Sequence, residues 1–314
     1  MNEHSPKPVI EARCLSKWFG EVVALNNLTV SIEPGVTGVL GPNGAGKSTF
    51  IKLALGLYAP SRGEIRVLGE PPRNNYRVLS RIGWCPEVDH FYDHISGFEF
   101  VYWLCRYWGM SPRAAETAAE RAGEMVRITD RMDDPVDEYS KGMRQRIKIA
   151  QALALSPELI FLDEPMNGLD PRSREEMYAL IRELGNRGIS VLVSSHILYE
   201  IERITDNVVL LIGGALIAQG RVREIRELID RYPHTIQVLS DQPALLAKRF
   251  AGEPGVFAVE TKGSAVTIRT LTPDSCYDAL NALAAESPDW VRSIECVDNN
   301  LQAVFDYLTR KNAL

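Results

Sequence analysis

A glycine-rich segment between an apolar run and a helical pattern constrains the fold of this chain more than any other feature. Residues 41–49 read GPNGAGKST, which satisfies the pattern GxxxxGK[ST]. Residues 36–40 before it are apolar, and residues 48–57 have helical spacing. This order of strand, loop and helix is the context that a phosphate-binding loop requires. An accidental glycine-rich turn is the alternative, and it would not explain the flanking elements.

The segment offers three kinds of group to an anion. Its glycines let backbone N–H groups turn inward around phosphate oxygens, and the following helix places its positive end beneath them. Lys47 supplies a positive charge for the outer phosphates, and Ser48 offers a hydroxyl to magnesium. The residues expected to bind the nucleotide are Gly41, Pro42, Asn43, Gly44, Ala45, Gly46, Lys47, Ser48 and Thr49.

A second apolar run ends in two carboxylates. Residues 159–162 read LIFL and are followed by Asp163 and Glu164. Together with a phosphate-binding loop, Asp163 is placed to help hold magnesium, and Glu164 to orient or deprotonate an attacking water. Alone, the same pattern describes a surface acidic pair that closes a strand.

Two further segments are weaker candidates. His196 follows the strand predicted over residues 190–194 and could bond a γ-phosphate oxygen, although a lone histidine there is usually structural or solvated. Residues 139–143, YSKGM, begin a helix whose start could bind an anion through Ser140 and the amides near Gly142. A plainly capped helix is the alternative.

Strands and helices alternate over residues 1–230, which predicts an α/β domain with a mostly parallel sheet. Residues 96–154 have few strand patterns and predict a helical insert, whose last helix follows Ser140. The strands are predicted over residues 9–15, 28–32, 36–40, 65–68, 81–85, 159–162, 190–194 and 208–212. The helices are predicted over residues 48–57, 97–108, 112–126, 143–155, 174–184 and 198–204.

The pattern changes after about residue 231. The order β-α-β-β-α-β, followed by a closing helix, predicts a small α+β, ferredoxin-like accessory domain over residues 231–314. No residue there marks a ligand site, so a dimer-stabilising appendage is favoured over a ligand-sensing module. The strands are predicted over residues 235–239, 256–261, 265–270 and 291–297, and the helices over 243–250, 273–285 and 301–308.

Composition disfavours several classes of protein. The net charge of -6 argues against a dedicated nucleic-acid binder. The five cysteines are odd in number and form no CxxC pair, which favours free thiols in a reducing cytoplasm over a disulfide framework or a zinc site. The first twelve residues lack the apolar core of a signal peptide, and the apolar stretch over residues 208–218 is too short to cross a bilayer. A role at a membrane would therefore need another chain.

Taken together, these segments resemble the ATP-binding cassette (ABC) ATPases over about residues 9–225. GPNGAGKST looks like the Walker A motif of that family, LIFLDEP like Walker B, and YSKGM like the signature motif, which usually reads LSGGQ. The resemblance implies a P-loop NTPase core that uses ATP and Mg2+, with Glu164 as catalytic base and His196 as switch histidine. NGLD, which ends at Asp170, looks like the D-loop. Phe19, in KWFG, matches the aromatic residue that stacks on adenine, and a core aromatic is the equal alternative.

Three positions depart from the family pattern. Glu87 stands in WCPE where the family usually has glutamine, and its carboxylate can still meet magnesium while adding charge near the phosphates. Lys141 replaces a glycine and Met143 replaces the glutamine of the signature motif. These changes affect how the signature residues would contact a partner's ATP, but they do not indicate a catalytically inactive site. The signature residues are Ser140, Lys141, Gly142 and Met143.

The resemblance also implies partners. In such proteins two ATPase subunits face head to tail, and each ATP lies between Walker A of one subunit and the signature motif of the other. ATP-driven closure then moves an integral membrane subunit, which places the ATPase at the cytoplasmic face of the membrane. YSKGMRQR and the C-terminal extension resemble the subgroup that serves exporters whose membrane part is a separate chain.

Two other functions are weighed against this one. A soluble ABC ATPase acting on DNA or ribosomes usually has coiled-coil inserts, zinc modules or two cassettes, none of which is visible in the sequence. A nucleotide-binding scaffold without turnover is disfavoured by Glu164 and His196. We therefore expect an ATPase subunit of a membrane transporter, with no nucleic-acid partner.

Overall fold

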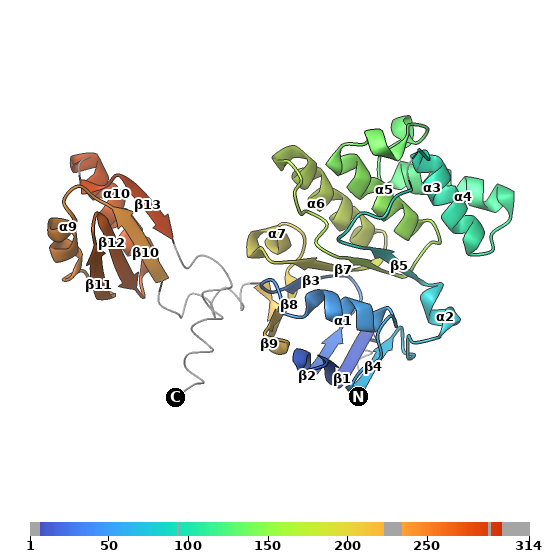
Figure 1. Ribbon diagram of the computed structural model, residues 1–314, viewed down its shortest axis with the longest axis horizontal. Coiled ribbons are helices and arrows are strands. Elements are labelled where there is room, and N and C mark those ends of the chain that lie inside the picture. The colour runs from blue at the N-terminus through green and yellow to red at the C-terminus, as the bar shows by residue number, and fades with distance from the viewer. Residues whose placement is uncertain (1–6, 93, 223–233, 288–289, 297–314) are drawn as a thin grey trace, which may run out of the picture. The chain divides into compact units, whose positions relative to one another are not determined.

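The computed structural model describes residues 7–92, 94–222, 234–287 and 290–296 (Figure 1). The chain divides into two compact units, Met1–Val222 and Arg223–Leu314. Among the described residues, no helix combines the length and the apolar character that a bilayer span needs.

A six-stranded sheet forms the centre of the first unit, in the order β5-β6-β7-β3-β8-β9. Its first five strands are parallel, and β9 runs antiparallel to β8. The prediction of an α/β fold with a mostly parallel sheet is confirmed. The strands are β3 (Val36–Leu40), β5 (Ile82–Cys85), β6 (Leu159–Leu162), β7 (Ser190–Ser195), β8 (Asn207–Ile212) and β9 (Ala215–Arg221).

A separate three-stranded antiparallel sheet has the order β2-β1-β4. Strands were predicted in these regions, but their separation from the parallel sheet was not. β1 and β2 extend further than predicted, to Phe19 and back to Val22, and most residues of the added segments are exposed or only partly buried. The strands are β1 (Ile10–Phe19), β2 (Val22–Ile32) and β4 (Arg62–Val67).

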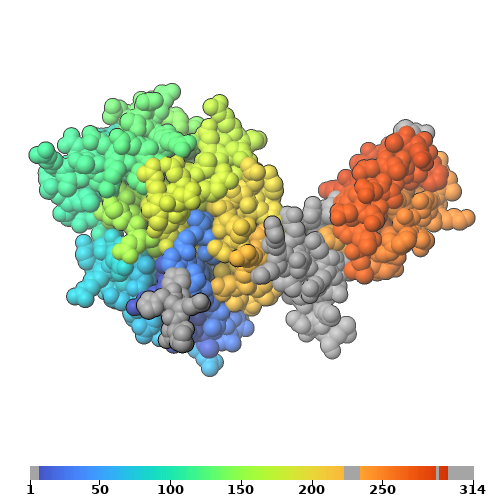
Figure 2. Space-filling model, turned by 180° about the vertical axis from the view of Figure 1, so that it is seen from behind, coloured from blue at the N-terminus to red at the C-terminus, as the bar shows by residue number. Residues whose placement is uncertain are grey.

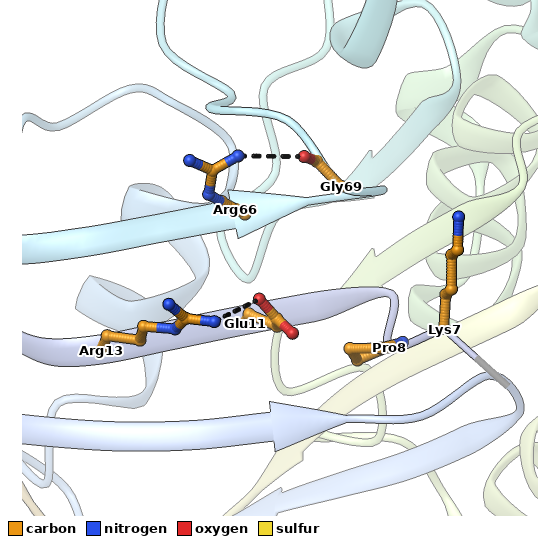
Figure 3. A pocket seen from close by; sticks show the side chains of 6 residues that line it. All are labelled: Lys7, Pro8, Glu11, Arg13, Arg66 and Gly69. Atoms are coloured by element: carbon orange, nitrogen blue, oxygen red, sulfur yellow. Dashed lines mark hydrogen bonds and ion pairs between the residues drawn. The ribbon is translucent and has the colours of Figure 1, made fainter. Parts of the chain in front are cut away.

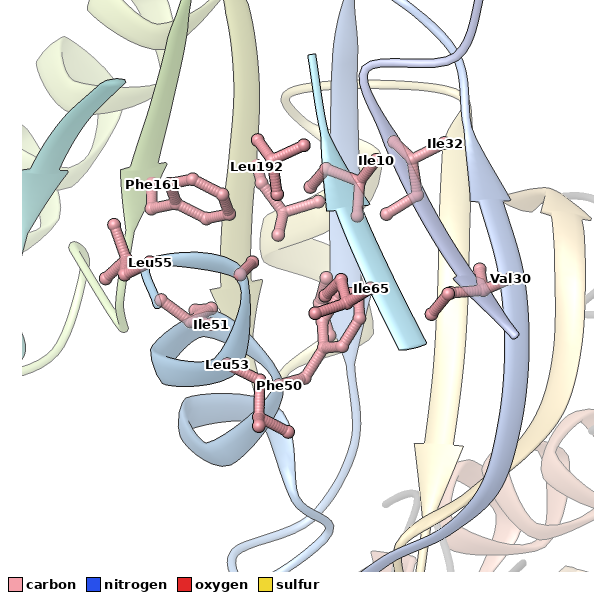
Figure 4. Packing of buried hydrophobic residues seen from close by; sticks show 14 of the residues in the cluster. Ile10, Val30, Ile32, Phe50, Ile51, Leu53, Leu55, Ile65, Phe161 and Leu192 are labelled. Carbon is pink, nitrogen blue, oxygen red and sulfur yellow. The ribbon is translucent and has the colours of Figure 1, made fainter. Parts of the chain in front are cut away.

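Helix α1 (Lys47–Ala54) packs in the core that joins the two sheets (Figure 4). Phe50 and Ile51 of α1 are fully buried with Ile10 and Ile65 of the antiparallel sheet and Phe161 of the parallel sheet. Burial of a large apolar side chain contributes about 1.5–3 kcal/mol. This packing fixes the helix directly after the glycine-rich loop and so fixes the loop.

The helical insert lies on the side of the parallel sheet opposite the antiparallel sheet, and Figure 2 shows the same separation from behind. Ser96 caps its first helix through a capping box with Glu99. The insert contains α3 (Gly97–Tyr107), α4 (Pro112–Met125), short 3-10 turns at Thr129–Arg131 and Val136–Glu138, and α5 (Lys141–Leu153). The remaining helices of the unit are α2 (Tyr76–Leu79), α6 (Pro171–Asn186) and α7 (Leu198–Glu202).

Side-chain caps explain where two helices begin. The predicted cap at Ser140 is confirmed: its hydroxyl accepts a hydrogen bond from Met143 N, and α5 starts at Lys141, two residues before the predicted range of 143–155. α6 starts at Pro171 rather than at residue 174, because Asp170 caps it. The short α2 and the strand β9 were not predicted.

The second unit has its own core and an antiparallel sheet in the order β11-β12-β10-β13. With the helices on one face of the sheet, this is the predicted ferredoxin-like topology. The predicted helix over residues 301–308 lies outside the described residues. The elements are β10 (His234–Leu239), α9 (Pro243–Phe250), β11 (Val256–Lys262), β12 (Ala265–Thr270), α10 (Pro273–Glu286) and β13 (Ser293–Cys296).

Candidate nucleotide-binding site

The glycine-rich loop leaves β3 and turns directly into α1. Gly44 and Gly46 have φ angles of +79° and +98°, which side chains rarely allow. A Cβ at Gly41 would collide with the carbonyl oxygen of Leu211 on β8. No side chain caps α1, so its first amides remain available to an anion.

Lys47 points back into this loop. Its Nζ donates to the carbonyl oxygens of Gly41 at 2.7 Å and Pro42 at 3.3 Å, and it lies 3.1 Å from Glu164 Oε1. The Lys47 side chain is 6% exposed and the Glu164 side chain 8% exposed. The first residue of α1 and the second carboxylate after β6 therefore form a buried ion pair.

The hydroxyls of Ser48 and Ser194 both contact Asp163. Ser48 Oγ donates to Asp163 Oδ1 at 3.2 Å, and Ser194 Oγ donates to the same oxygen at 2.7 Å. Ser194 Oγ also accepts from the backbone N–H of Glu164 at 2.8 Å. Sequence reasoning missed Ser194, although a serine directly after the apolar run of residues 191–193 is an available indication.

Glu164 also contacts His196. Its second oxygen, Oε2, lies 2.9 Å from His196 Nδ1. Glu164 has a φ of +48°, and a non-glycine residue in this region is uncommon outside functional sites and turns. The backbone after β6 thus turns the carboxylate between Lys47 and His196, so that each oxygen has one partner.

Glu87 lies two residues beyond β5, in an exposed position. Its backbone oxygen accepts from Lys148 Nζ of α5 at 3.1 Å. Among the described residues, no group of three or more His, Cys, Asp and Glu side chains is arranged to hold a metal ion. Next to the loop, the side-chain oxygens of Ser48 and Asp163 lie together.

Phe19 is the last residue of β1, and its side chain is 42% exposed. Its ring meets Tyr58 edge to face with centroids 5.2 Å apart, and Lys17 Nζ lies 4.9 Å from its centroid. This exposure does not fit the alternative that Phe19 is an aromatic residue of the core. Stacking on adenine remains a prediction.

The residues predicted to form the signature motif lie beside the predicted D-loop. A Cβ on Gly168 would collide with Lys141 Nζ, and one on Gly142 would lie 3.0 Å from Ser173 Oγ. Asp170 accepts from the backbone N–H groups of Arg172 and Ser173, both at 3.0 Å. The side-chain hydrogen bond from Ser173 is the largest cause that lowers the pKa of Asp170.

A separate hollow of about 310 Å³ lies on the antiparallel sheet (Figure 3). Within its lining, Arg13 pairs with Glu11 at 3.6 Å. It contains none of the predicted site residues, and we assign no ligand to it. The lining residues are Lys7, Pro8, Glu11, Arg13, Arg66 and Gly69.

Comparison with known proteins identifies the family. The family model described as ABC transporter matches residues 25–167. A Nod factor export ATP-binding protein I of Burkholderia lata is 34% identical over 251 residues, covering 77% of this chain and 83% of that protein. The chain belongs to the ABC transporter family. A protein of the same name from Rhizobium etli is 35% identical over 236 residues, covering 72% of this chain and 75% of its own length.

A solved structure supports the same assignment. The structure of cbiO1 from Clostridium perfringens, described as part of the ABC transporter complex cbiONQ, has a TM-score of 0.64 and 25% identity. The match covers 71% of this chain and 93% of that chain. As an ABC ATP-binding subunit, the chain binds and hydrolyses ATP. The predicted family, α/β core and ATPase activity are confirmed.

Proposed function

We propose that this chain is the cytoplasmic ATPase of an exporter whose membrane-spanning part is a separate polypeptide. The relatives in Burkholderia and Rhizobium are named as export ATP-binding proteins, and they match most of this chain. Two such subunits would close over ATP, and their closing and reopening would move the membrane subunit. The alignment with export proteins is the observation that carries this proposal.

The proposed catalytic base is Glu164. Its carboxylate is held by Lys47 on one side and His196 on the other, at the carboxyl edge of the parallel sheet. With the phosphates of ATP engaging Lys47, Glu164 would orient and deprotonate the attacking water. His196 would fix the other oxygen of the base and sense the γ-phosphate.

The oxygens of Ser48 and Asp163 suit magnesium. They are hard donors 3.2 Å apart, and magnesium is usually held by one or two protein groups together with phosphates and waters. When bound, the metal would neutralise charge on the phosphates. Ser194 would keep Asp163 oriented, and Glu87 would complete the site from the neighbouring strand.

Residues on other elements would complete the nucleotide site. Phe19 would stack on adenine, and the residues of the loop from Gly41 to Thr49 would surround the phosphates. Ser140 and its signature neighbours would face the ATP of a second subunit, since they start a helix whose N-terminus favours anions. Asp170 would hold the D-loop against them.

A localisation experiment tests the exporter proposal. The full chain is expressed with and without a membrane protein from a neighbouring open reading frame, and cell fractions are probed. We expect it in the membrane fraction only with that partner, on the cytoplasmic face and released by an alkaline wash. Equal recovery without any membrane protein would count against the proposal.

We propose that the second unit stabilises the dimer of ATPase subunits. It has a core of its own, in which Ile236, Val266 and Leu280 are fully buried, so it can act as an independent module. Sedimentation of the full chain and of a chain ending at residue 222, both with the Glu164→Gln change and ATP, measures this role. A dimer of unchanged strength after truncation would rule it out.

A further inference from the structure

Helix α5 holds the end of β5 and the segment after it with three side chains from one face. Gln145, Lys148 and Gln151 are spaced three residues apart, which places them in a row along the helix. Gln145 Nε2 donates to Cys85 Sγ at 3.4 Å, and Gln151 Nε2 donates to Trp84 O at 2.6 Å. The end of β5 is therefore tied to the helix that begins with the signature residues.

Lys148 lies at the middle of this row, and its side chain is only 4% exposed. Its ammonium donates to Pro86 O at 3.0 Å and Glu87 O at 3.1 Å, and it lies 2.7 Å from Asp89 Oδ1. A lysine ammonium has three N–H donors, and these three acceptors match that number. All three acceptors belong to residues 86–89, so one buried charge fixes the path of this segment.

The segment that Lys148 holds begins at the proposed magnesium site. Cys85 pairs with Leu162 in the parallel sheet, and Asp163 N donates to Cys85 O at 3.0 Å. Glu87 follows two residues later. Since its side chain is exposed, its position depends mainly on the backbone that Lys148 binds.

We propose that Lys148 is a positioning residue for ATP hydrolysis, which holds Glu87 at the magnesium side of the site and links it to the signature helix. The inference rests on the proposed role of Glu87. Lys148 contacts neither nucleotide nor metal in this mechanism. It acts through the backbone of residues 86–89.

Lys148→Met tests the proposal, because methionine keeps much of the volume and removes the charge. ATPase activity of the full chain is measured against magnesium concentration at saturating ATP. We expect the magnesium concentration for half-maximal activity to rise about tenfold, the usual effect of losing an outer-shell partner of a metal site. Lys148→Arg should recover part of the loss, because it keeps the charge beside Asp89.

A double-mutant cycle separates positioning from a general structural role. Adding Lys148→Met to Glu87→Ala should change the magnesium dependence no further, because the two residues act on one step. Arg203→Met is the control, since it breaks an exposed ion pair with Glu175 at 2.7 Å and should leave the dependence at the wild-type value. The rise in melting temperature on adding ATP and magnesium is measured for all variants and should follow the same pattern, because it reports binding independently of turnover.

The outcomes distinguish this inference from the proposal on which it rests. Wild-type magnesium dependence in Glu87→Ala would refute the role of Glu87 and the inference with it. An impaired Glu87→Ala beside an unaffected Lys148→Met would refute the inference alone. An equal loss from Lys148→Met in the wild-type and Glu87→Ala backgrounds would also refute it, because the residues would then act independently.

Discussion

Lys47 Nζ and Glu164 Oε1 lie 3.1 Å apart in a buried ion pair that joins the phosphate-binding loop to the strand end of β6. His196 holds the other oxygen of Glu164 at 2.9 Å. The proposed base is therefore paired on both sides by groups that would also meet phosphates. Phosphate oxygens at the loop would compete with Glu164 for the charge of Lys47, which would connect ATP binding to release of the base.

Glu164→Gln should abolish turnover while ATP binding persists. The amide cannot accept the proton of the attacking water, and loss of a general base typically lowers the rate by about 10²–10⁴-fold. Removal of a negative charge near the phosphates should also tighten ATP binding about fivefold, which corresponds to roughly 1 kcal/mol of relieved repulsion. Steady-state ATPase assays and calorimetric titration with ATP measure the two effects.

The control for this variant is Glu175→Gln. Glu175 lies on α6 and pairs with Arg203 at an exposed position, so its loss of charge should leave both quantities unchanged. Wild-type turnover in Glu164→Gln would remove Glu164 from the role of base.

Ser194→Ala should weaken both the fold and the site. The hydroxyl is fully buried, donates to Asp163 and accepts from Glu164 N, so its removal leaves a buried N–H without that acceptor. We expect a stability loss of about 1–3 kcal/mol and a rate or magnesium affinity lowered about tenfold. Denaturant unfolding and magnesium-dependent ATPase assays measure these changes.

Ser190→Ala provides the comparison at the opposite end of β7. Ser190 is also buried, and its hydroxyl accepts from Gly35 N at 3.4 Å. Its loss should affect stability but not the magnesium dependence. If both variants lose the same activity, Ser194 acts only through the fold.

Sequence patterns predicted the positions of the buried strands better than they predicted which strands pair in a sheet. β3 and β6 are short, almost fully buried strands, and their bounds were predicted to the residue. The antiparallel sheet was missed because alternation identifies a half-buried strand but not the strand beside it. β9 was missed because Ala215–Arg221 has only partly buried or exposed residues and follows directly after Gly213 and Gly214.

The motifs likewise identified candidate residues, but they did not predict how those residues are arranged in space. The sequence places Lys47 and Glu164 in separate motifs and contains nothing that requires their ion pair. Ser194 was missed because its function depends on the parallel register of β6 and β7, which aligns two strand ends 31 residues apart in the chain. From the sequence alone, Lys148 is expected on the solvent-exposed face of its helix, and only the tertiary structure shows that it is buried.

Phe19→Ala should raise the KM for ATP with little change in kcat. Loss of a stacked aromatic ring typically costs about 1–3 kcal/mol of base binding. Because the ring is 42% exposed, its removal should lower the free energy of unfolding much less than a core substitution would. ATPase kinetics and competition by GTP against ATP measure the effect.

Phe257→Ala is the matched control for Phe19→Ala. Phe257 is 54% exposed in the second unit, and its loss should leave the KM unchanged. Phe19→Tyr should retain most of the affinity, since the ring is kept. A KM for Phe19→Ala equal to that of the wild type would exclude adenine stacking by this residue.

Gly46→Ala should abolish ATP binding because it distorts the phosphate-binding loop. Gly46 has a φ of +98°, and an added Cβ would lie 2.6 Å from Ala24 O and 2.7 Å from Leu25 Cδ2. Both neighbours belong to β2, so the loop rather than the sheet should move. Thermal melting with and without ATP and magnesium measures the loss, because a bound ligand raises the melting temperature by an amount that grows with the ratio of its concentration to its Kd.

Gly188→Ala separates loop distortion from backbone strain. Gly188 has a φ of +85°, but an added Cβ there would meet no atom within 4 Å. Both alanine variants bear the cost of a positive φ, about 1–2 kcal/mol. Only Gly46→Ala should also lose the melting shift caused by ATP. If Gly46→Ala keeps the full shift, the close approach of the loop to β2 is not required for nucleotide binding.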